Sequence, residues 1–330
     1  MINLILQYPD DSAGSIMTTE YVGLHEDDIV SDAFDTIRST GLNKETIYTC
    51  YVIRKDHLLL GVVTAKDLML ANQHDRIGDI MDTHLIYAYT LDDQEIIAEK
   101  FQKYSLLAMP VVDKEKRLVG IITIDDIVDV IVEENTEDIE MMGALVPSDE
   151  PYIKSGIFKL AKNRIVWLLV LMLSATVTGL IVSNYEARMV ALPILMVFIP
   201  LLMDTGGNAG AQTSTLIIRG MAVGEISSRD IFRILWKETR IAMLLGLGLG
   251  IINFIWVYVL YGQNLLLSAA VTATLFCALL IAKVLGCILP ILAKQVRIDP
   301  AIMAAPLITT ICDALSLVIY FSIAKVILGL

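Results

Sequence analysis

The sequence has few of the side chains with which enzymes perform nucleophilic or redox chemistry. Its 330 residues include only four cysteines and four histidines. No two cysteines have the CxxC spacing of a zinc or redox site, and three lie in apolar stretches, where a thiol behaves as a small hydrophobic group. All four histidines lie at or before His84, and no nucleophile is paired with a base in the pattern. We therefore expect no disulfide, no zinc centre and no enzyme.

Charge is also scarce, and it is unevenly distributed. Charged residues make up 19% of the chain and hydrophobic residues 55%, which is too apolar for one soluble domain of this length. Residues 1–150 carry 11 Lys and Arg against 30 Asp and Glu, whereas residues 151–330 carry 14 against 7. This predicts an acidic soluble half followed by a membrane half. An acidic surface argues against nucleic-acid binding and favours cations, although it can also be a simply solvated face.

One pattern occurs twice in the acidic half. The run YTCYVIRKDHLLLGVVTAKDLM recurs as LAMPVVDKEKRLVGIITIDDIV. Each copy predicts helix, strand, hairpin, strand and helix, with strands at 50–54 and 109–112 and returning strands at 58–63 and 118–122. We assign residues 1–75 to the first repeat and residues 76–132 to the second.

The two copies resemble the cystathionine-β-synthase-type (CBS) domain, an α/β domain that works as a tandem pair. The resemblance rests on the motif Gly-φ-φ-Thr-x-x-Asp (φ, apolar), which begins at Gly61 and again at Gly120. In that family the Thr and Asp can hold a nucleotide ribose. The resemblance thus implies ATP or another adenine nucleotide at Thr64, Asp67, Thr123 and Asp126. A Thr followed three residues later by an acid is also a capping box, which needs no ligand, and we expect this role as the minimum.

An acidic helix is predicted after the second repeat. Residues 125–142 have apolar side chains at helical spacing and several carboxylates. We assign residues 133–150 to this linking helix and expect Pro147 to end it. A run of charge is usually a solvated face. Packed carboxylates repel one another, however, and a divalent cation can bridge them, so the conformation of this helix would depend on cation concentration.

Five apolar spans are predicted in the second half, at residues 165–182, 189–218, 241–261, 265–293 and 301–328. Basic residues precede the first span and lie between the second and third and between the fourth and fifth. The opposite side offers Arg188 and the uncharged residues 262–264. The positive-inside rule therefore predicts a multi-pass plasma-membrane protein with a cytosolic N-terminal half and an external C-terminus. The N-terminus lacks the basic flank and the apolar core of a signal peptide.

Two polar features interrupt the spans. Asp313 lies fourteen residues after Asp299, which corresponds to about 21 Å along a helix, close to a bilayer midplane. Such a carboxylate either faces an ion path or is held by a neighbour, here Thr309, Thr310, Ser316 or Lys283. The second feature is the run 203–215, which includes Asn208 and several glycines. It must line protein or water, and we favour a pore over simple helix packing.

The whole chain resembles the MgtE family of magnesium channels. The resemblance rests on the tandem CBS repeats, the acidic helix, TGGNAGAQ in the second span and DP…P…D in the fifth. It implies a multidomain protein in which an α/β tandem CBS domain precedes an all-α domain of five transmembrane helices. It also implies a homodimer whose pore lies between the second and fifth spans of both subunits.

The same resemblance implies a role for each matching residue. Asp313 is the conduction-site carboxylate, and Asn208 lies at the pore. Asp299 lies at the cytosolic mouth and faces the linking, or plug, helix with Glu137 and Asp138. The matching magnesium-sensing positions are Asp126 and Asp129.

The sequence departs from the family at three places, and we expect conduction to be preserved and the strength of gating by magnesium to be affected. Most members carry an acidic helical domain before the CBS pair, and here the sequence starts almost at the repeat. Ala305 stands where some members have a polar pore residue, and Ser105 stands where an acid contributes to sensing.

The sequence therefore predicts passive flow of hydrated Mg²⁺, gated by cytosolic Mg²⁺. Mg²⁺ prefers oxygen ligands and sheds water reluctantly, and the residues above offer oxygens only. Transport of Mn²⁺ or Co²⁺ remains an alternative, because these ions accept the same ligands. A second alternative is a non-conducting sensor in which the CBS pair binds nucleotide and the membrane spans only anchor the protein. Asp313 favours the channel over the sensor, because a membrane anchor gains nothing from a carboxylate at the bilayer midplane.

Overall fold

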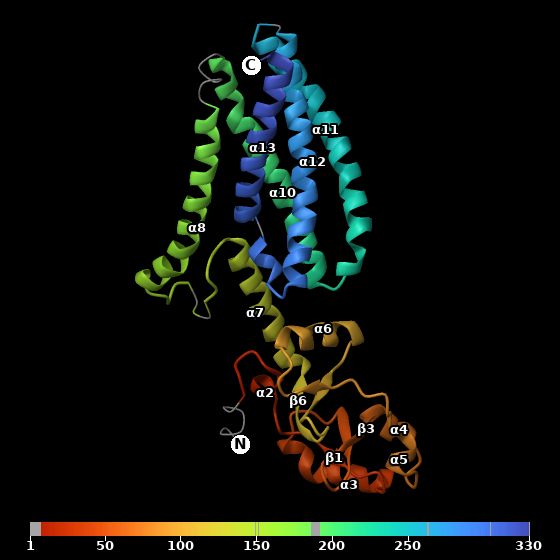
Figure 1. Cartoon of the computed structure of the whole chain (residues 1–330). Helices are drawn as coiled ribbons and strands as arrows, with labels where there is room; N and C mark the ends of the chain where they lie inside the picture. Colours follow the sequence, from red (N-terminus) through yellow and green to blue (C-terminus); the bar gives the residue numbers. More distant parts are fainter. Residues whose placement is uncertain are drawn as a thin grey trace. The chain divides into compact units, whose positions relative to one another are not determined.

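The chain folds into two compact units, Met1–Asn135 and Thr136–Leu330 (Figure 1). The computed structural model describes residues 8–148, 150, 152–185, 192–262, 264–303 and 305–329. The boundary between the units falls inside one continuous helix, α7 (Ile124–Met142). Arg188, which entered the orientation argument, lies outside the described residues.

The first unit contains two three-stranded sheets of the same topology. One consists of β1 (Gly23–Leu24), β2 (Thr49–Ile53) and β3 (Leu59–Thr64), and the other of β4 (Ala88–Tyr89), β5 (Ala108–Val112) and β6 (Leu118–Thr123). In both, the first strand is parallel to the second and the second is antiparallel to the third. Both hairpins also shift register at the equivalent place. The predicted repeat is confirmed, whereas the short strands β1 and β4 were not predicted, because two residues carry too little alternation to be recognised.

Helices flank these sheets. The longer ones are α3 (Val30–Thr40), α4 (Ala65–Leu70) and α6 (Gln94–Tyr104), and the short ones are α2 (Ala13–Ile16) and α5 (Ile77–Ile80).

The two repeats exchange their leading segments. Thr18, which follows α2, forms a reciprocal backbone pair with Ile121 of the second sheet, and Asp82, which follows α5, does the same with Val62 of the first sheet. Each exchange lies over a motif glycine: a Cβ on Gly120 would be 2.7 Å from the carbonyl oxygen of Thr18. The start of each sequence repeat therefore packs on the sheet of the other copy, and neither copy has a complete core alone.

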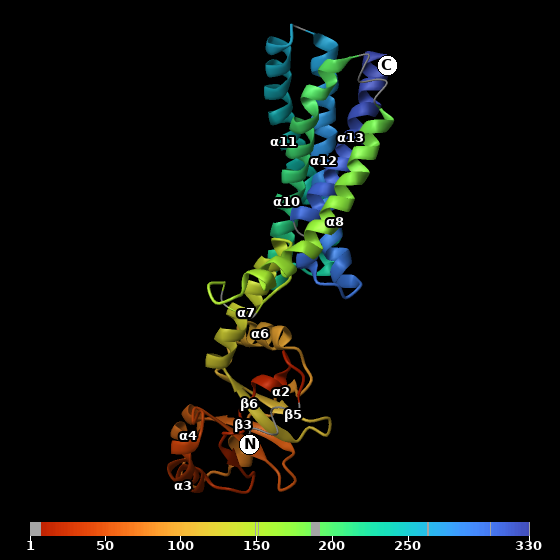
Figure 2. The ribbon, with the colours of Figure 1, turned by 90° about the vertical axis from the view of Figure 1, so that its left-hand side faces the viewer.

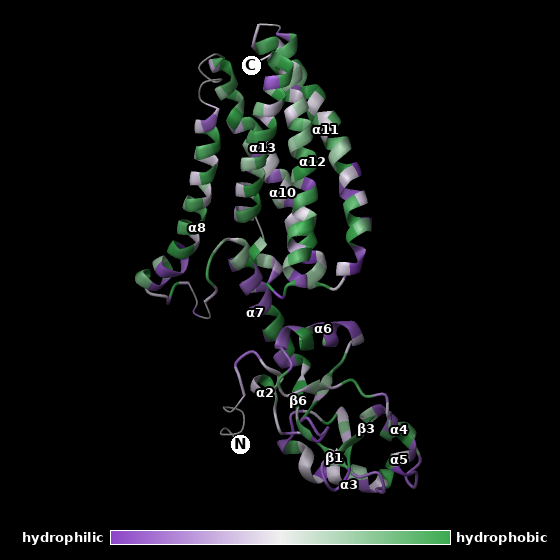
Figure 3. Ribbon diagram, viewed as in Figure 1, coloured by the Kyte–Doolittle hydropathy of each residue, from purple (hydrophilic) through white to green (hydrophobic). Residues whose placement is uncertain are grey.

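The second unit contains five helices that are long and apolar enough to cross a membrane. They are α8 (Ile157–Asn184), α10 (Ile199–Ala222, after a 3₁₀ turn at Pro193–Phe198), α11 (Ile231–Leu260, after a 3₁₀ turn at Ser228–Asp230), α12 (Leu265–Gln295) and α13 (Ala305–Leu328, after a 3₁₀ turn at Pro300–Met303). They are mostly hydrophobic along the ribbon, with hydrophilic turns on α10 and α11 among others (Figure 3). The five predicted spans are confirmed.

Helix α12 is the centre of this bundle. It packs against α10, α11 and α13, and α10 and α13 also pack against each other. Helix α8 lies beside α13, and none of the residues of α8 is buried (Figure 2). The bundle core thus consists of α10, α12 and α13, the helices that carry the predicted pore residues.

Helix α7 ends earlier than the sequence predicted. It stops at Met142, and Ala144 adopts a left-handed conformation with φ of 55°. The expected termination at Pro147 and the helix boundary at residue 150 are therefore wrong, because the backbone turns at Gly143 and Ala144 first. The final turn packs Met141 and Met142 against Ile218 and Ala301.

Candidate functional site

Glycines bring α10 and α13 into close contact. A Cβ on Gly207 would lie 3.2 Å from Oδ1 of Asp313, and a Cβ on Gly206 would lie 2.7 Å from Oγ of Ser316. Both glycines are buried, as is Gly210. These residues therefore serve packing, the interpretation that we had favoured less, and they place the Asp313 carboxylate directly against the backbone of α10.

Five polar residues of α10, four from this run and one a helical turn beyond it, lie on a different face of the helix. They occur at intervals of four, four, three and four residues, which keeps them on one side of a helix. All of them are exposed on the single chain. This polar stripe consists of Asp204, Asn208, Gln212, Thr215 and Arg219. Polar side chains along a membrane span are costly against lipid, so the stripe requires water or another protein surface.

Asp313 is half-buried beside the stripe. Asp204 is close enough for the two carboxylate charges to repel each other. Asp204 was not among the site residues predicted from the sequence, although its spacing of one helical turn from Asn208 was an available signal.

None of the local partners considered for Asp313 binds it. The hydroxyls of Thr309 and Thr310 donate instead to the carbonyl oxygen of Pro306, at 3.0 and 2.9 Å. Lys283 pairs with Glu238. Within the part of the chain that the structure describes, the Asp313 carboxylate accepts no hydrogen bond and forms no ion pair. It is thus available to a cation.

A second acidic group lies at the other end of α10. Burial and the nearby Asp299 raise the pKa of Asp138, and Arg219 opposes that shift. The Asp299 side chain is fixed in position, because its Oδ1 accepts a 2.7 Å hydrogen bond from the backbone amide of Ala301. The structure therefore brings Asp138 and Asp299 together, as expected at the mouth. Glu137 is half-buried one residue earlier.

The candidate nucleotide residues make capping contacts. In the first repeat, Thr64 Oγ1 donates to Oδ2 of Asp67 at 2.6 Å, and the two residues form a complete capping box. In the second repeat, Thr123 Oγ1 donates to Oδ2 of Asp126 at 2.8 Å. The minimum role expected for these residues is what the geometry supports. Asp126 and the exposed Asp129 belong to the first unit.

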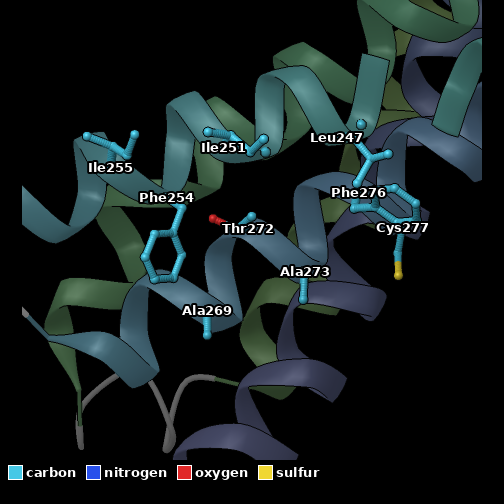
Figure 4. Close-up of a pocket in the computed structure, with 11 residues that line it drawn as sticks. Leu247, Ile251, Phe254, Ile255, Ala269, Thr272, Ala273, Phe276 and Cys277 are labelled. Carbon is cyan, nitrogen blue, oxygen red and sulfur yellow. The ribbon is translucent and has the colours of Figure 1, made fainter. Parts of the chain in front are cut away.

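One pocket of the membrane unit is not an ion site. It has a volume of about 520 Å³ and lies between α11 and α12, where Phe254, Ile251 and Phe276 surround it (Figure 4). Its lining contains no carboxylate, and Thr272 contributes the one hydroxyl among the residues that line it. Among the described residues, no group of three or more His, Cys, Asp or Glu side chains could hold a metal ion. A single subunit therefore offers separate oxygen ligands rather than a closed cage.

The chain matches two family models. Residues 199–323 match the MgtE model, described as a divalent cation transporter, and residues 13–74 and 77–133 match the CBS domain. The chain is 36% identical over 327 residues to the magnesium transporter MgtE of Thermus thermophilus, covering 99% of this chain and 72% of that protein. It is 35% identical over 323 residues to the Bacillus subtilis magnesium transporter MgtE, covering 98% and 71%.

Among solved structures, the soluble part of a magnesium transporter is 38% identical, covers 40% of this chain and 52% of its own, and has a TM-score of 0.40. The cytosolic domain of the Mg²⁺ channel MgtE in complex with ATP is also 38% identical, covers 39% and 52%, and has a TM-score of 0.39. The relatives that match nearly the whole chain are named as transporters, which agrees with the expectation that this protein is not an enzyme. The chain belongs to the MgtE family of divalent cation transporters.

Proposed function

We propose that this protein is a Mg²⁺ channel in which hydrated Mg²⁺ passes along the α10 stripe and Asp313. The observation that carries the proposal is a carboxylate within the apolar helix α13 that has no protein partner in the described structure and lies beside the exposed polar stripe of α10. The relatives named as magnesium transporters supply the choice of ion.

A second copy of the chain would close the path. The stripe is exposed on one subunit, and lipid is a poor solvent for Asp204, Asn208 and Gln212. In a homodimer the stripes of two subunits would face each other across water, with two Asp313 carboxylates near the axis. Mg²⁺ sheds water slowly and prefers octahedral oxygen ligands, so carboxylates and amide oxygens would hold its first water shell rather than replace it.

The direction of flow would follow the electrochemical gradient. With the first unit in the cytosol, a negative internal potential contributes about 2.3 kcal/mol per elementary charge per 100 mV to entry. No residue in the path needs to exchange a proton or hydrolyse a nucleotide for this flow.

Cytosolic Mg²⁺ would act as its own inhibitor. The Asp138 and Asp299 charges repel each other, and a bound cation would remove that repulsion and hold the end of α7 against the mouth. The carboxylates assigned to this sensing are Asp126, Asp129, Glu137, Asp138 and Asp299. We further propose that the CBS pair is where ATP or another adenine nucleotide would bind, with Thr64, Asp67, Thr123 and Asp126 at the ribose.

The test is Mg²⁺ flux into proteoliposomes that contain the whole chain, with internal Mg²⁺ kept low. Asp313→Asn keeps the shape of the side chain and removes its charge, and we expect it to abolish flux or the preference for Mg²⁺. Glu225→Gln is the matched control, because Glu225 is an exposed carboxylate between α10 and α11. Equal flux in all three proteins would reduce Asp313 to a packing residue.

Two other results would identify the alternatives. Greater flux of Mn²⁺ or Co²⁺ than of Mg²⁺ would reassign the ion. Absence of flux for every ion would favour a membrane-anchored sensor.

A further inference from the structure

A second group of charged side chains lies inside the bundle, and the proposed ion path does not use it. It joins three helices: Thr213 on α10 is 0% exposed, Glu238 on α11 is 9% exposed, and Lys283 on α12 is 5% exposed. Thr213 Oγ1 donates to Glu238 Oε2 at 3.1 Å, and Lys283 Nζ lies 3.6 Å from the same oxygen. One carboxylate oxygen therefore binds groups from both neighbouring helices.

A gain in folding stability does not explain why this buried charged group is present. Two buried charges lose their hydration, and an apolar pair of similar volume usually packs as well or better. Charged residues within membrane spans are costly and generally have a specific task. A buried polar contact can instead select one arrangement of helices among several that pack similarly, because its geometry is directional.

Beside this group, α12 approaches α10 through a glycine. Gly286, three residues after Lys283, faces the backbone of α10, where its Cβ would lie 2.6 Å from the carbonyl oxygen of Gly210 and 2.9 Å from Cβ of Thr213. A glycine against a backbone permits close approach but offers no side chain to resist rotation or sliding. The hydrogen bond of Thr213 lies beside this contact, and because Lys283 of α12 binds the same oxygen of Glu238, the three side chains give the contact a direction.

The rotation of α10 about its axis decides where the polar stripe points. Thr213 directly follows Gln212, a member of the stripe, so a rotation that breaks the Thr213 bond moves the stripe by the same angle. On the other side of α10, Gly207 faces Asp313. A change in rotation would therefore alter the alignment of the stripe with Asp313.

We propose that Glu238 is a positioning residue of the ion path, which through Thr213 and Lys283 sets the rotation of α10 and thereby the ion preference. This inference rests on the proposed function. Loss of the Thr213 hydroxyl is expected to reduce or abolish the preference for Mg²⁺ over Mn²⁺, because the stripe would no longer be held in one alignment with Asp313. The same loss should lower the unfolding temperature, because the buried Glu238 loses a hydrogen bond.

The experiment compares three threonine variants of the whole chain in proteoliposomes. Thr213→Val removes the hydroxyl that binds Glu238, and Thr213→Ser retains it. Thr274→Val is the matched control, because Thr274 is also 0% exposed but donates only to its own helix, at Ala270, 2.8 Å away. The measured quantity is the ratio of Mg²⁺ flux to Mn²⁺ flux, with thermal unfolding of each purified protein as the check on folding.

We expect Thr213→Val to lower the ratio of Mg²⁺ flux to Mn²⁺ flux. Thr213→Ser and Thr274→Val should leave this ratio as it is in the unaltered chain. The double variant Glu238→Met with Lys283→Met removes both charges together with the oxygen that accepts from Thr213, leaves no unpaired ion, and should reproduce the ratio of Thr213→Val. An unchanged ratio in Thr213→Val, in a protein that is still folded at the assay temperature, would overturn the inference and leave the proposed function standing. Absence of flux in the unaltered chain would overturn the proposed function, and this inference with it.

Discussion

Gly286 offers a direct test of the contact between α10 and α12. A Cβ at this position would lie 2.6 Å from the carbonyl oxygen of Gly210, whereas ordinary contact begins near 3.4 Å. Gly286→Ala therefore requires the two helices to separate by about 0.8 Å. The obstacle is backbone, so no side-chain rotamer can relieve it. Overpacking of this kind costs about 1–3 kcal/mol.

The assay is thermal unfolding of the purified whole chain in detergent, with Gly248→Ala as the control. A Cβ on Gly248 meets nothing within 4 Å, and alanine favours a helix by up to about 1 kcal/mol over glycine. We expect Gly286→Ala to lower the melting temperature by about 2–4 °C for each kcal/mol lost. Gly248→Ala should leave it unchanged or raise it. An equal or higher melting temperature for Gly286→Ala would refute the close contact of α12 with α10.

Three further predictions concern the first unit and the mouth. Thr64→Ala should weaken the cap of α4 by about 0.5–2 kcal/mol, measured as faster amide hydrogen exchange in that helix. Since burial and Asp299 raise the pKa of Asp138, docking of the end of α7 should be strongest below the unfolded pKa near 4 and should weaken as pH rises through the higher folded pKa. The measurement is amide hydrogen exchange at the end of α7 as a function of pH, corrected for the intrinsic exchange rate. Asp138→Asn should remove the pH dependence of protection, while Asp129→Asn, a change at an exposed residue, should keep it. Burial raises the pKa of the Cys50 thiol to about 12, so iodoacetamide at pH 8 should leave it unmodified until the chain unfolds, and labelling in the native state would contradict its complete burial.

Local pattern was sufficient for much of the architecture. The repeat was readable because each copy has its own alternation of apolar residues, its own hairpin and its own capping motif. The membrane spans were readable because roughly twenty consecutive apolar residues leave few other choices. The depth of Asp313 stays a prediction, and the helix assumed between Asp299 and Asp313 is interrupted, because a 3₁₀ turn at Pro300–Met303 precedes α13.

The partners of side chains were decided only by the tertiary structure. Thr309, Thr310, Ser316 and Lys283 were all plausible neighbours of Asp313 by sequence, but helix rotation turned the threonines to their own backbone and Lys283 toward Glu238. Rotation is set by packing against other helices, which hydropathy does not encode.

The exchange of α2 and α5 between the repeats has the same origin. Each leading segment reads as part of the copy that follows it, yet its hydrogen bonds are made with the sheet of the other copy. The sequence by itself determined the elements, their order and the carboxylate in the membrane, because these depend on periodicity and length. The tertiary structure decided which faces meet, and so which polar groups remain free to bind an ion, because close contact at the glycines joins residues that are distant along the chain.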